Sequence, residues 1–399
     1  MHILMIAPEP FFEPRGTPFS EFHRVRALVA LGHTVDLVTY PFGCDVDMAG
    51  LRIVRCPRPP FITRVKIGPS WAKVPLDLSL ALTAAWQSLR VNYDAVHSHE
   101  EAGAIGVMLS RLMGVPHLYD MHSSLPQQLA NFDYGAGAWL TRLFGWLERV
   151  MIRRSRVVIV ICPALEDTVR TVDTTVAVVL IENAPGSGDA PVQGTGASVR
   201  SDLGISAETP MILYTGTFEA YQGLDLLFDA MRLVVAKRPD ARLVLAGGEP
   251  AQVEAARQAV SDRDLADAVT LAGQRPADEI PAFLDAASVL VSPRSTGTNT
   301  PLKIYQYLRS GRPIVATRLR THTQVLSDDT AFLADPTAEG FAAALLEAMN
   351  DPARAAATGE RARHLAETKY TDEAFIGKTA RALAILAGGD EPEPVEGPA

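Results

Sequence analysis

The sequence predicts an α/β protein with two parallel-sheet domains, and three observations carry this prediction. The chain has 399 residues, enough for two domains of about 150–200 residues each. Short apolar runs that end in small or polar residues alternate with helical patterns, as strands and helices of buried parallel sheets do. A stretch rich in Gly, Pro, Ser and Asp interrupts this alternation, which then begins afresh. We therefore expect Rossmann-like domains at 1–184 and 209–370, joined by a linker at 185–208.

The composition narrows the class of protein. Residues 1–200 hold 18 basic and 18 acidic residues, so the net charge of −9 lies entirely in the remainder. A nucleic-acid-binding protein normally has a basic domain, so we expect no nucleic-acid partner. Cys44, Cys56 and Cys162 lack metal-ligand or CxxC spacing, and the start lacks a signal-peptide pattern, which predicts a cytoplasmic protein. The acidic, Pro-rich tail at 388–399 is expected to be disordered.

The first strand is expected at residues 2–6 and the first helix at 19–31. Gly16 and Thr17 lie in the loop between them, where backbone can closely approach a phosphate or sugar. The loop is not GxGxxG, which weakens a dehydrogenase interpretation. A second strand is expected at 34–40.

Residues 51–73 contain six basic residues and no acid, with Phe61 and Trp71 among them. Such a segment would suit an anionic membrane surface or a phosphorylated acceptor. The alternative is a solvated loop.

Histidines mark the ends of the next two strands. His97 and His99 flank the end of a strand at 94–97, and a metal site there would need further ligands. His122 follows a strand at 116–120. Open α/β sheets bind ligands at the carboxyl ends of their strands, so His122 is a functional candidate, and a structural histidine is the alternative.

The remaining elements continue the alternation. Residues 139–156 have a helical period with aromatic and basic sides, and we favour a core helix over one that lies on a bilayer. The other expected strands are at 156–162, 175–181, 211–215, 242–246, 269–272 and 288–292. The other expected helices are at 101–113, 224–237, 337–350, 352–368 and 372–387.

Residues 290–317 read as strand, polar loop, helix, Gly stop and strand. We expect Thr300 at the N-cap and Pro301 at the first helical position, with Gly311 ending the helix. Leu302, Tyr305 and Leu308 are expected on its inner face.

Lys303 lies in the first turn of this helix, where the macrodipole disfavours a cation. An anion held at the helix N-terminus by the N–H groups of Leu302 and Lys303 would explain it, and Arg294 could approach the same anion. The alternative is an ordinary strand-to-helix loop with a surface lysine.

Two stretches, GTFEAYQGLDLL and SPRSTGTNTPLKIYQYLRSGRPIVAT, resemble donor-binding segments of GT-B glycosyltransferases of the GT4 type. The resemblance covers nearly the whole chain. It implies the GT-B fold, two Rossmann-like domains with a deep cleft, and a terminal helix at 371–387 that crosses back to the first domain. It also implies retaining transfer of a hexose-type sugar from a nucleotide-diphosphate donor to a glycan or lipid-linked acceptor in cell-surface synthesis.

Further expectations follow from the resemblance. No metal or other cofactor is expected, so Asp45-Val46-Asp47 is not taken as a metal site. The protein would be cytoplasmic or peripheral at the inner face of the membrane, with 51–73 as the candidate contact.

The resemblance also implies site residues. His122 corresponds to the histidine that touches the donor sugar. Thr298 and Gln306 stand where the family has a pair of glutamates, and Gln222 stands where it has a lysine. Arg294 and Lys303 would therefore have to neutralise the diphosphate here. The implied donor-binding residues are Gly16, Thr17, Gly216, Gln222, Gly223, Arg275, Arg294, Thr298, Asn299, Thr300, Leu302, Lys303 and Gln306.

Two alternatives to an active transferase remain. A non-catalytic nucleotide-sugar-binding or partner subunit would fit Thr298, Gln222 and Gln306, whereas His122 and Lys303, together with Gly16, argue against it. A sugar epimerase would need acid/base carboxylates in the cleft, and the sequence shows no convincing pair.

Overall fold

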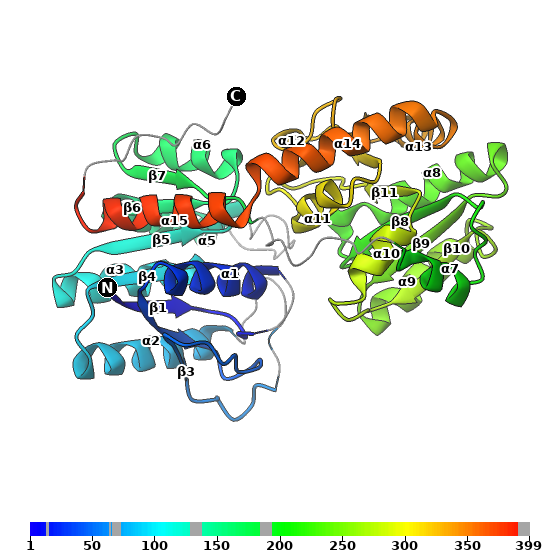
Figure 1. Cartoon of the computed structure of the whole chain (residues 1–399). Coiled ribbons are helices and arrows are strands. Elements are labelled where there is room, and N and C mark those ends of the chain that lie inside the picture. Colours follow the sequence, from blue (N-terminus) through cyan, green and yellow to red (C-terminus); the bar gives the residue numbers. More distant parts are fainter. Residues whose placement is uncertain (13–15, 64, 66–72, 128–137, 184–193, 390–399) are drawn as a thin grey trace. The chain divides into compact units, whose positions relative to one another are not determined.

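The computed structural model describes residues 1–12, 16–63, 65, 73–127, 138–183 and 194–389. The chain divides into two compact units (Figure 1). The first runs to Asn183 and includes the C-terminal segment from Asp372; the second comprises the residues between.

The first unit is a seven-stranded parallel sheet in the order β3-β2-β1-β4-β5-β6-β7. Its strands are β1 (His2–Ala7), β2 (Thr34–Thr39), β3 (Leu51–Arg55), β4 (Ala95–His99), β5 (His117–Met121), β6 (Val157–Val160) and β7 (Ala177–Leu180). Its helices are α1 (Gly16–Ala30), α2 (Lys73–Arg90), α3 (Gly103–Met113), α5 (Ala138–Arg154), α6 (Pro163–Val172) and α15 (Asp372–Leu386), with a 3-10 turn at Glu100–Ala102.

Helices cover both faces of this sheet because successive strand residues point to opposite sides. Ile3 and Met5 of β1 pack in the cluster that holds α1 and α15, whereas Leu4 and Ile6 pack in the cluster that holds α2. On the second face, α3 packs against both α2 and α5. The described helices include none with the length and apolar character needed to cross a membrane.

The second unit is a six-stranded parallel sheet in the order β10-β9-β8-β11-β12-β13. Its strands are β8 (Met211–Gly216), β9 (Arg242–Gly247), β10 (Val269–Gly273), β11 (Val289–Ser292), β12 (Ile314–Thr317) and β13 (Phe332–Ala334). Its helices are α7 (Gly196–Asp202), α8 (Leu224–Lys237), α9 (Pro250–Ser261), α10 (Ile280–Ala286), α11 (Leu302–Ser310), α12 (Arg320–Thr323), α13 (Ala338–Asn350) and α14 (Pro352–Lys369), with a 3-10 turn at Ala220–Gln222. Two parallel-sheet α/β units confirm the predicted fold class.

The linker is shorter than the expected 185–208. The second half of that range forms α7, which packs on α10 as part of the second unit. The backbone N–H of Gly196 donates to Asp285 at 2.9 Å, and Arg200 donates to the carbonyl of Ala286 at 2.8 Å. The glycine and serine content of these residues does not predict a helix. Hydrogen bonds to residues distant in the sequence stabilise it instead. Residues 185–193 of the expected linker lie outside the described residues, as do residues 390–399 of the expected disordered tail.

The stretch 51–73 is not simply a loop. Leu51–Arg55 forms the edge strand β3, and its basic residues meet acidic partners: Arg52 pairs with Asp36, and Arg55 with Asp45 at 2.7 Å. Lys73, at the start of α2, pairs with Glu101 at 2.9 Å. Half of the six basic residues are therefore already neutralised, while Arg64, Lys66 and Trp71 lie outside the described residues.

Two helix expectations need correction. Pro301, with φ −63° and ψ 134°, occupies the N-cap of α11, so the helix begins one residue later than expected, at Leu302. Leu302 is only half-buried, and the inner face holds Ile304, Tyr305, Tyr307 and Leu308. Gly311 ends the helix in the left-handed conformation, as predicted.

Other helices and strands also begin or end at different residues than expected. The first helix begins at Gly16, so Gly16 and Thr17 lie in its first turn rather than in the preceding loop. The strand β4 includes both His97 and His99, which therefore do not flank its end. The expected core helix α5 packs through its C-terminal part, where Met151 and Ile152 are buried, whereas its N-terminal part is largely exposed.

Candidate functional site

In an open parallel sheet the ligand crevice forms where the strand order reverses, at the carboxyl ends of the strands. In the second unit that point lies between β8 and β11. Gly216 ends β8, and the loop after β11 leads to the N-terminus of α11. Most of the predicted donor-binding residues lie at this edge.

Lys303, the second residue of α11, is at its centre. Only 8% of this residue is exposed. Its ammonium lies 3.4 Å from Oε1 of Gln222 and 3.8 Å from the centre of the Tyr214 ring. Burial, with the nearby positive charge of Arg294, lowers the pKa of Lys303 well below its usual value. Among the described residues, no carboxylate forms an ion pair with it. A buried cation without a counter-ion is costly, so the site favours an anionic ligand.

The backbone around Lys303 points to the same kind of ligand. Lys303 and Leu302 open α11, so their N–H groups are among those that a helix leaves without an internal acceptor. The hydroxyl of Thr300, which precedes the N-cap residue Pro301, is buried without a hydrogen-bond partner in the described part of the chain. Helix N-termini of this kind bind phosphate well.

Gly216 and Gly223 make room at this edge. Gly216 has φ +130°, and a Cβ there would lie 3.0 Å from the Lys303 ammonium. Gly223, with φ +73°, would bring a Cβ within 2.1 Å of the Pro293 carbonyl. Both positions therefore require glycine.

Arg294 makes hydrogen bonds within and beside the loop that precedes α11. Its guanidinium donates to the carbonyl of Asn299 at 2.7 Å and to Thr321 at 3.0 Å. Gln324 donates to the carbonyl of Thr298 at 2.8 Å. Arg294 thus fixes the loop that precedes α11, and its positive charge adds to the effect of burial in lowering the pKa of Lys303.

Two predicted residues lie less centrally. Gln306, three residues after Lys303, is half-buried on the neighbouring position of the same helix face. Arg275 donates to the carbonyl of Ala272 at 3.1 Å and lies 3.7 Å from Glu279 on the exposed β10–α10 turn. That geometry is typical of a surface charge.

In the first unit the strand order reverses between β1 and β4, and His122 lies at the same carboxyl edge, directly after β5. Its Nε2 lies 3.2 Å from Oδ1 of Asp120 and 3.3 Å from Nδ1 of His99. Asp120 also accepts a hydrogen bond of 2.9 Å from Arg24. Burial raises the pKa of Asp120, but the charges of Arg24 and the histidines outweigh it and hold the pKa well below its usual value.

Three carboxyl groups at this edge were missed by the sequence analysis. Glu9 follows β1, Glu100 follows β4, and Glu21 projects from α1; all are buried. Burial and the charge of Glu21 raise the pKa of Glu9 well above its usual value, and burial does the same for Glu21. Burial raises the pKa of Glu100 to about 8. Their positions at strand ends were a usable signal for Glu9 and Glu100, but only the tertiary fold brings Glu21 to them.

Glu100→Gln is expected to weaken the pH dependence of stability in the first unit. A carboxyl group whose folded-state pKa is raised contributes stability below its unfolded pKa of about 4.3 and loses it as pH rises through about 8. The wild type should therefore lose up to about 1.4 kcal/mol more per pH unit than the variant between pH 5 and 8. All four tryptophans belong to the first unit, so urea unfolding followed by tryptophan fluorescence measures it. Parallel pH profiles would contradict the assignment.

His97, His99 and Asp120 place their ligand atoms within 4.8 Å of one another, the spacing of a metal site. Arg24, however, already bonds the same carboxylate oxygen that lies 3.3 Å from His97. A guanidinium at that oxygen opposes a second cation, so the cluster fits a hydrogen-bonded charge network better than a metal centre. Asp45, in the DxD sequence, pairs with Arg55.

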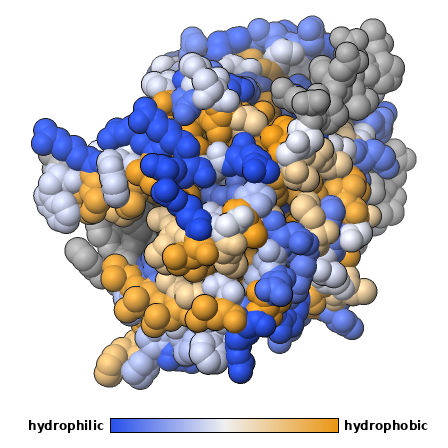
Figure 2. Space-filling model, turned by 90° about the vertical axis from the view of Figure 1, so that its left-hand side faces the viewer, coloured by the Kyte–Doolittle hydropathy of each residue, from blue (hydrophilic) through white to orange (hydrophobic). Residues whose placement is uncertain are grey.

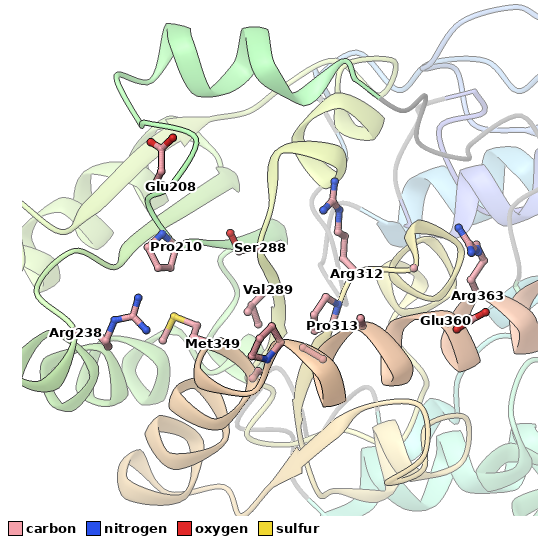
Figure 3. Close-up of a pocket in the computed structure, with 15 residues that line it drawn as sticks. Glu208, Pro210, Arg238, Ser288, Val289, Arg312, Pro313, Met349, Glu360 and Arg363 are labelled. Carbon is pink, nitrogen blue, oxygen red and sulfur yellow. The ribbon is translucent and has the colours of Figure 1, made fainter.

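Figure 3 shows a surface depression elsewhere in the second unit. Pro210, Ser288 and Pro313, which line it, immediately precede β8, β11 and β12. It therefore lies at the amino ends of the strands, opposite to the edge that holds Lys303. Its Arg312 pairs with Asp285 at 2.9 Å. The position argues against a role in the chemistry expected of this fold.

Comparisons with known proteins identify the family. Residues 23–184 match the family described as glycosyl transferase 4-like domain, and residues 209–351 match glycosyl transferases group 1. The chain therefore belongs to the group 1, GT4-type glycosyltransferases, and the predicted resemblance is confirmed.

Curated relatives are transferases with varied substrates. The chain is 29% identical over 271 residues to 2-deoxystreptamine N-acetyl-D-glucosaminyltransferase of Streptomyces fradiae, covering 62% of this chain and 61% of that protein. It is 27% identical to alpha-maltose-1-phosphate synthase of Mycolicibacterium smegmatis, covering 67% and 73%. The match thus spans less than two thirds of the first of these relatives.

Solved structures agree on the fold. Sucrose-phosphate synthase from Thermosynechococcus elongatus superimposes with a TM-score of 0.79 at 21% identity, covering 97% of this chain and 99% of that one. Anabaena HepE in complex with UDP-glucose gives 0.75 at 16% identity, covering 96% and 99%. These likenesses show the GT-B fold.

Proposed function

We propose that this chain is a retaining glycosyltransferase that moves a hexose-type sugar from a nucleotide-diphosphate donor to a hydroxyl acceptor. The buried amine of Lys303 at the N-terminus of α11 carries the proposal, because an anion beside it would favour its charged form and the described residues supply none. The relatives named above include a sugar transferase, and another is a GDP-mannose-dependent mannosyltransferase of M. smegmatis, 29% identical over 210 residues covering 51% of this chain and 54% of that protein.

The chemistry asked of the second unit is electrostatic. Cleavage of the bond from the anomeric carbon to the diphosphate leaves negative charge on the departing phosphate. The Lys303 ammonium and the N–H groups that open α11 would stabilise that charge. The acceptor oxygen bonds to the same carbon and its proton leaves with the diphosphate. No metal ion is needed for this charge balance.

The first unit would bind the hydroxyl acceptor. Glu9 and Glu100 follow two of its strands, and Glu21 projects from α1. Their raised pKa values favour neutral carboxyl groups that both donate and accept hydrogen bonds. Such groups suit a hydroxyl-rich acceptor. A glycan or glycolipid of the cell surface fits this chemistry, and His122 stays the candidate catalytic residue.

Thermal unfolding with UDP, GDP, ADP, their sugars and the matching nucleosides tests donor binding. One base is expected to raise the midpoint by several degrees at saturating diphosphate, with little effect of its nucleoside. If no nucleotide shifts the midpoint, the proposal fails.

A second candidate, a non-catalytic nucleotide-sugar-binding subunit, is favoured by Gln222, Thr298 and Gln306, which stand where the family has charged residues. Binding of a nucleotide sugar that is never turned over, even with lipid and glycan acceptors present, would support it.

A further inference from the structure

Exposed large apolar side chains concentrate on three helices of the first unit. Figure 2 shows hydrophobic side chains gathered at the lower left of the surface, beside a hydrophilic group. Exposure is high: 82% for Leu89 and 76% for Leu112. The exposed apolar side chains of the three helices are Val74, Leu78, Leu82, Trp86 and Leu89 on α2, Met108 and Leu112 on α3, and Trp139, Leu143 and Trp146 on α5.

These side chains share one side of the unit because α3 packs against both α2 and α5. On α2 the exposed apolar residues recur every three or four positions and so form one stripe. A second stripe, Leu76, Leu80 and Ala84, is buried. It lies two positions away in register, on the opposite side of the helix. A helix that is apolar on both sides normally has both sides covered.

The same three helices are strongly basic where they are exposed. Their exposed arginines are Arg90, Arg111, Arg142, Arg149, Arg153 and Arg154. Their two acidic residues face inward: Asp77 accepts a hydrogen bond from Tyr40, and Glu148 accepts one of 2.8 Å from the backbone of Leu125. This surface, which we call the α2/α3/α5 face, is therefore cationic in a chain of net charge −9.

Tryptophan and arginine are interleaved on the α2/α3/α5 face. The Arg90 guanidinium lies 4.6 Å from the Trp86 ring centre. On α5, Arg142 and Arg149 each follow a tryptophan by three positions, so they share its stripe. Amphipathic side chains of this kind sit at the boundary between lipid headgroups and hydrocarbon.

We propose that the α2/α3/α5 face binds peripherally to an anionic lipid bilayer. The apolar stripes would enter the headgroup region while the arginines meet lipid phosphates. A second copy of the chain is a poorer occupant, because two cationic faces would repel each other. The proposal does not rest on catalytic activity, and it places the contact on these helices rather than on 51–73.

Co-sedimentation with phosphatidylglycerol/phosphatidylcholine vesicles tests this face. The wild type should bind, lose binding in high salt, and show blue-shifted tryptophan emission because Trp86, Trp139 and Trp146 lie on the face. Two triple variants, Leu78→Gln/Leu82→Gln/Leu89→Gln and Arg90→Glu/Arg111→Glu/Arg142→Glu, should each lower the affinity by about tenfold or more. Leu233→Gln and Arg232→Glu, exposed on α8 of the second unit, are the matched controls and should bind like the wild type.

The changed side chains are exposed, so the urea midpoints of all variants should equal that of the wild type, which separates binding from folding. Absence of vesicle binding by the wild type, or equal binding by wild type and both triple variants, would overturn the proposal. A dimer in light scattering that the leucine variant converts to a monomer, without vesicle binding, would assign the face to a second copy instead.

Discussion

Replacing Lys303 by alanine is expected to lower the affinity for the cognate nucleoside diphosphate by about 10- to 100-fold, while the affinity for the nucleoside changes by less than about twofold. A charge-assisted hydrogen bond contributes about 1.5–3 kcal/mol, and here the ammonium is buried, which reduces screening by water. The nucleoside has no phosphate to meet Lys303. Isothermal titration calorimetry with both ligands measures the difference.

The structure offers a rescue variant as a control. Because Gln222 lies 3.4 Å from the Lys303 ammonium, Gln222→Lys in the Lys303→Ala background returns a positive charge to the same place. Diphosphate affinity should then recover in large part. Equal losses for diphosphate and nucleoside in the single variant would show that Lys303 does not meet the phosphates.

Proton uptake should accompany diphosphate binding. Burial lowers the pKa of Lys303 in the free protein, and an adjacent anion favours the charged form. Affinity should therefore fall as pH rises through the lysine's free-state pKa, and the binding enthalpy should vary with the ionisation enthalpy of the buffer. In Lys303→Ala, the contribution of this lysine to the pH dependence of the affinity and to the buffer dependence of the binding enthalpy disappears.

Arg24→Met is expected to destabilise the first unit by about 3–5 kcal/mol. Arg24 and Asp120 form a fully buried pair, and removing one partner leaves the other charge uncompensated. The matched control is Arg26→Met, whose pair with Asp372 is exposed and should cost no more than about 1 kcal/mol.

The pH dependence of this effect has a definite sign. The depressed pKa of Asp120 contributes stability above its unfolded pKa, and that contribution is lost as pH falls through the folded-state value. The gap between wild type and Arg24→Met should therefore narrow in acid, where a protonated Asp120 needs no counter-ion. Urea unfolding followed by tryptophan fluorescence gives the free energy of unfolding of each variant. Similar losses of stability in Arg24→Met and Arg26→Met would contradict a strongly stabilising buried pair of Arg24 and Asp120.

Much of the fold was predictable because periodicity and turn residues mark strands and helices directly. The helix α8 has the expected bounds, and β8 extends only one residue further. The helix α2 was missed because its outer apolar stripe obscures the usual one-sided pattern. The short helix α7 was missed because distant residues, not its own sequence, hold it.

The candidate site was predictable where a local rule applied. Lys303 stood out because a cation in a first helical turn is unfavourable, and the structure places it beside Gln222. The loop-fixing contacts of Arg294 could not be foreseen, since Thr321 is distant in sequence. The approach of Glu21 to the ends of β1 and β4 likewise depends on how α1 packs.

NMR of the wild type with the nucleotide sugar whose base stabilises it tests most directly whether this chain is a working retaining glycosyltransferase. We expect slow release of the sugar, the first anomer formed having the configuration of the donor, and a loss of turnover in Lys303→Ala at subsaturating donor. An inverted anomer would contradict the retaining mechanism. No release or transfer above the Lys303→Ala background would contradict a working transferase.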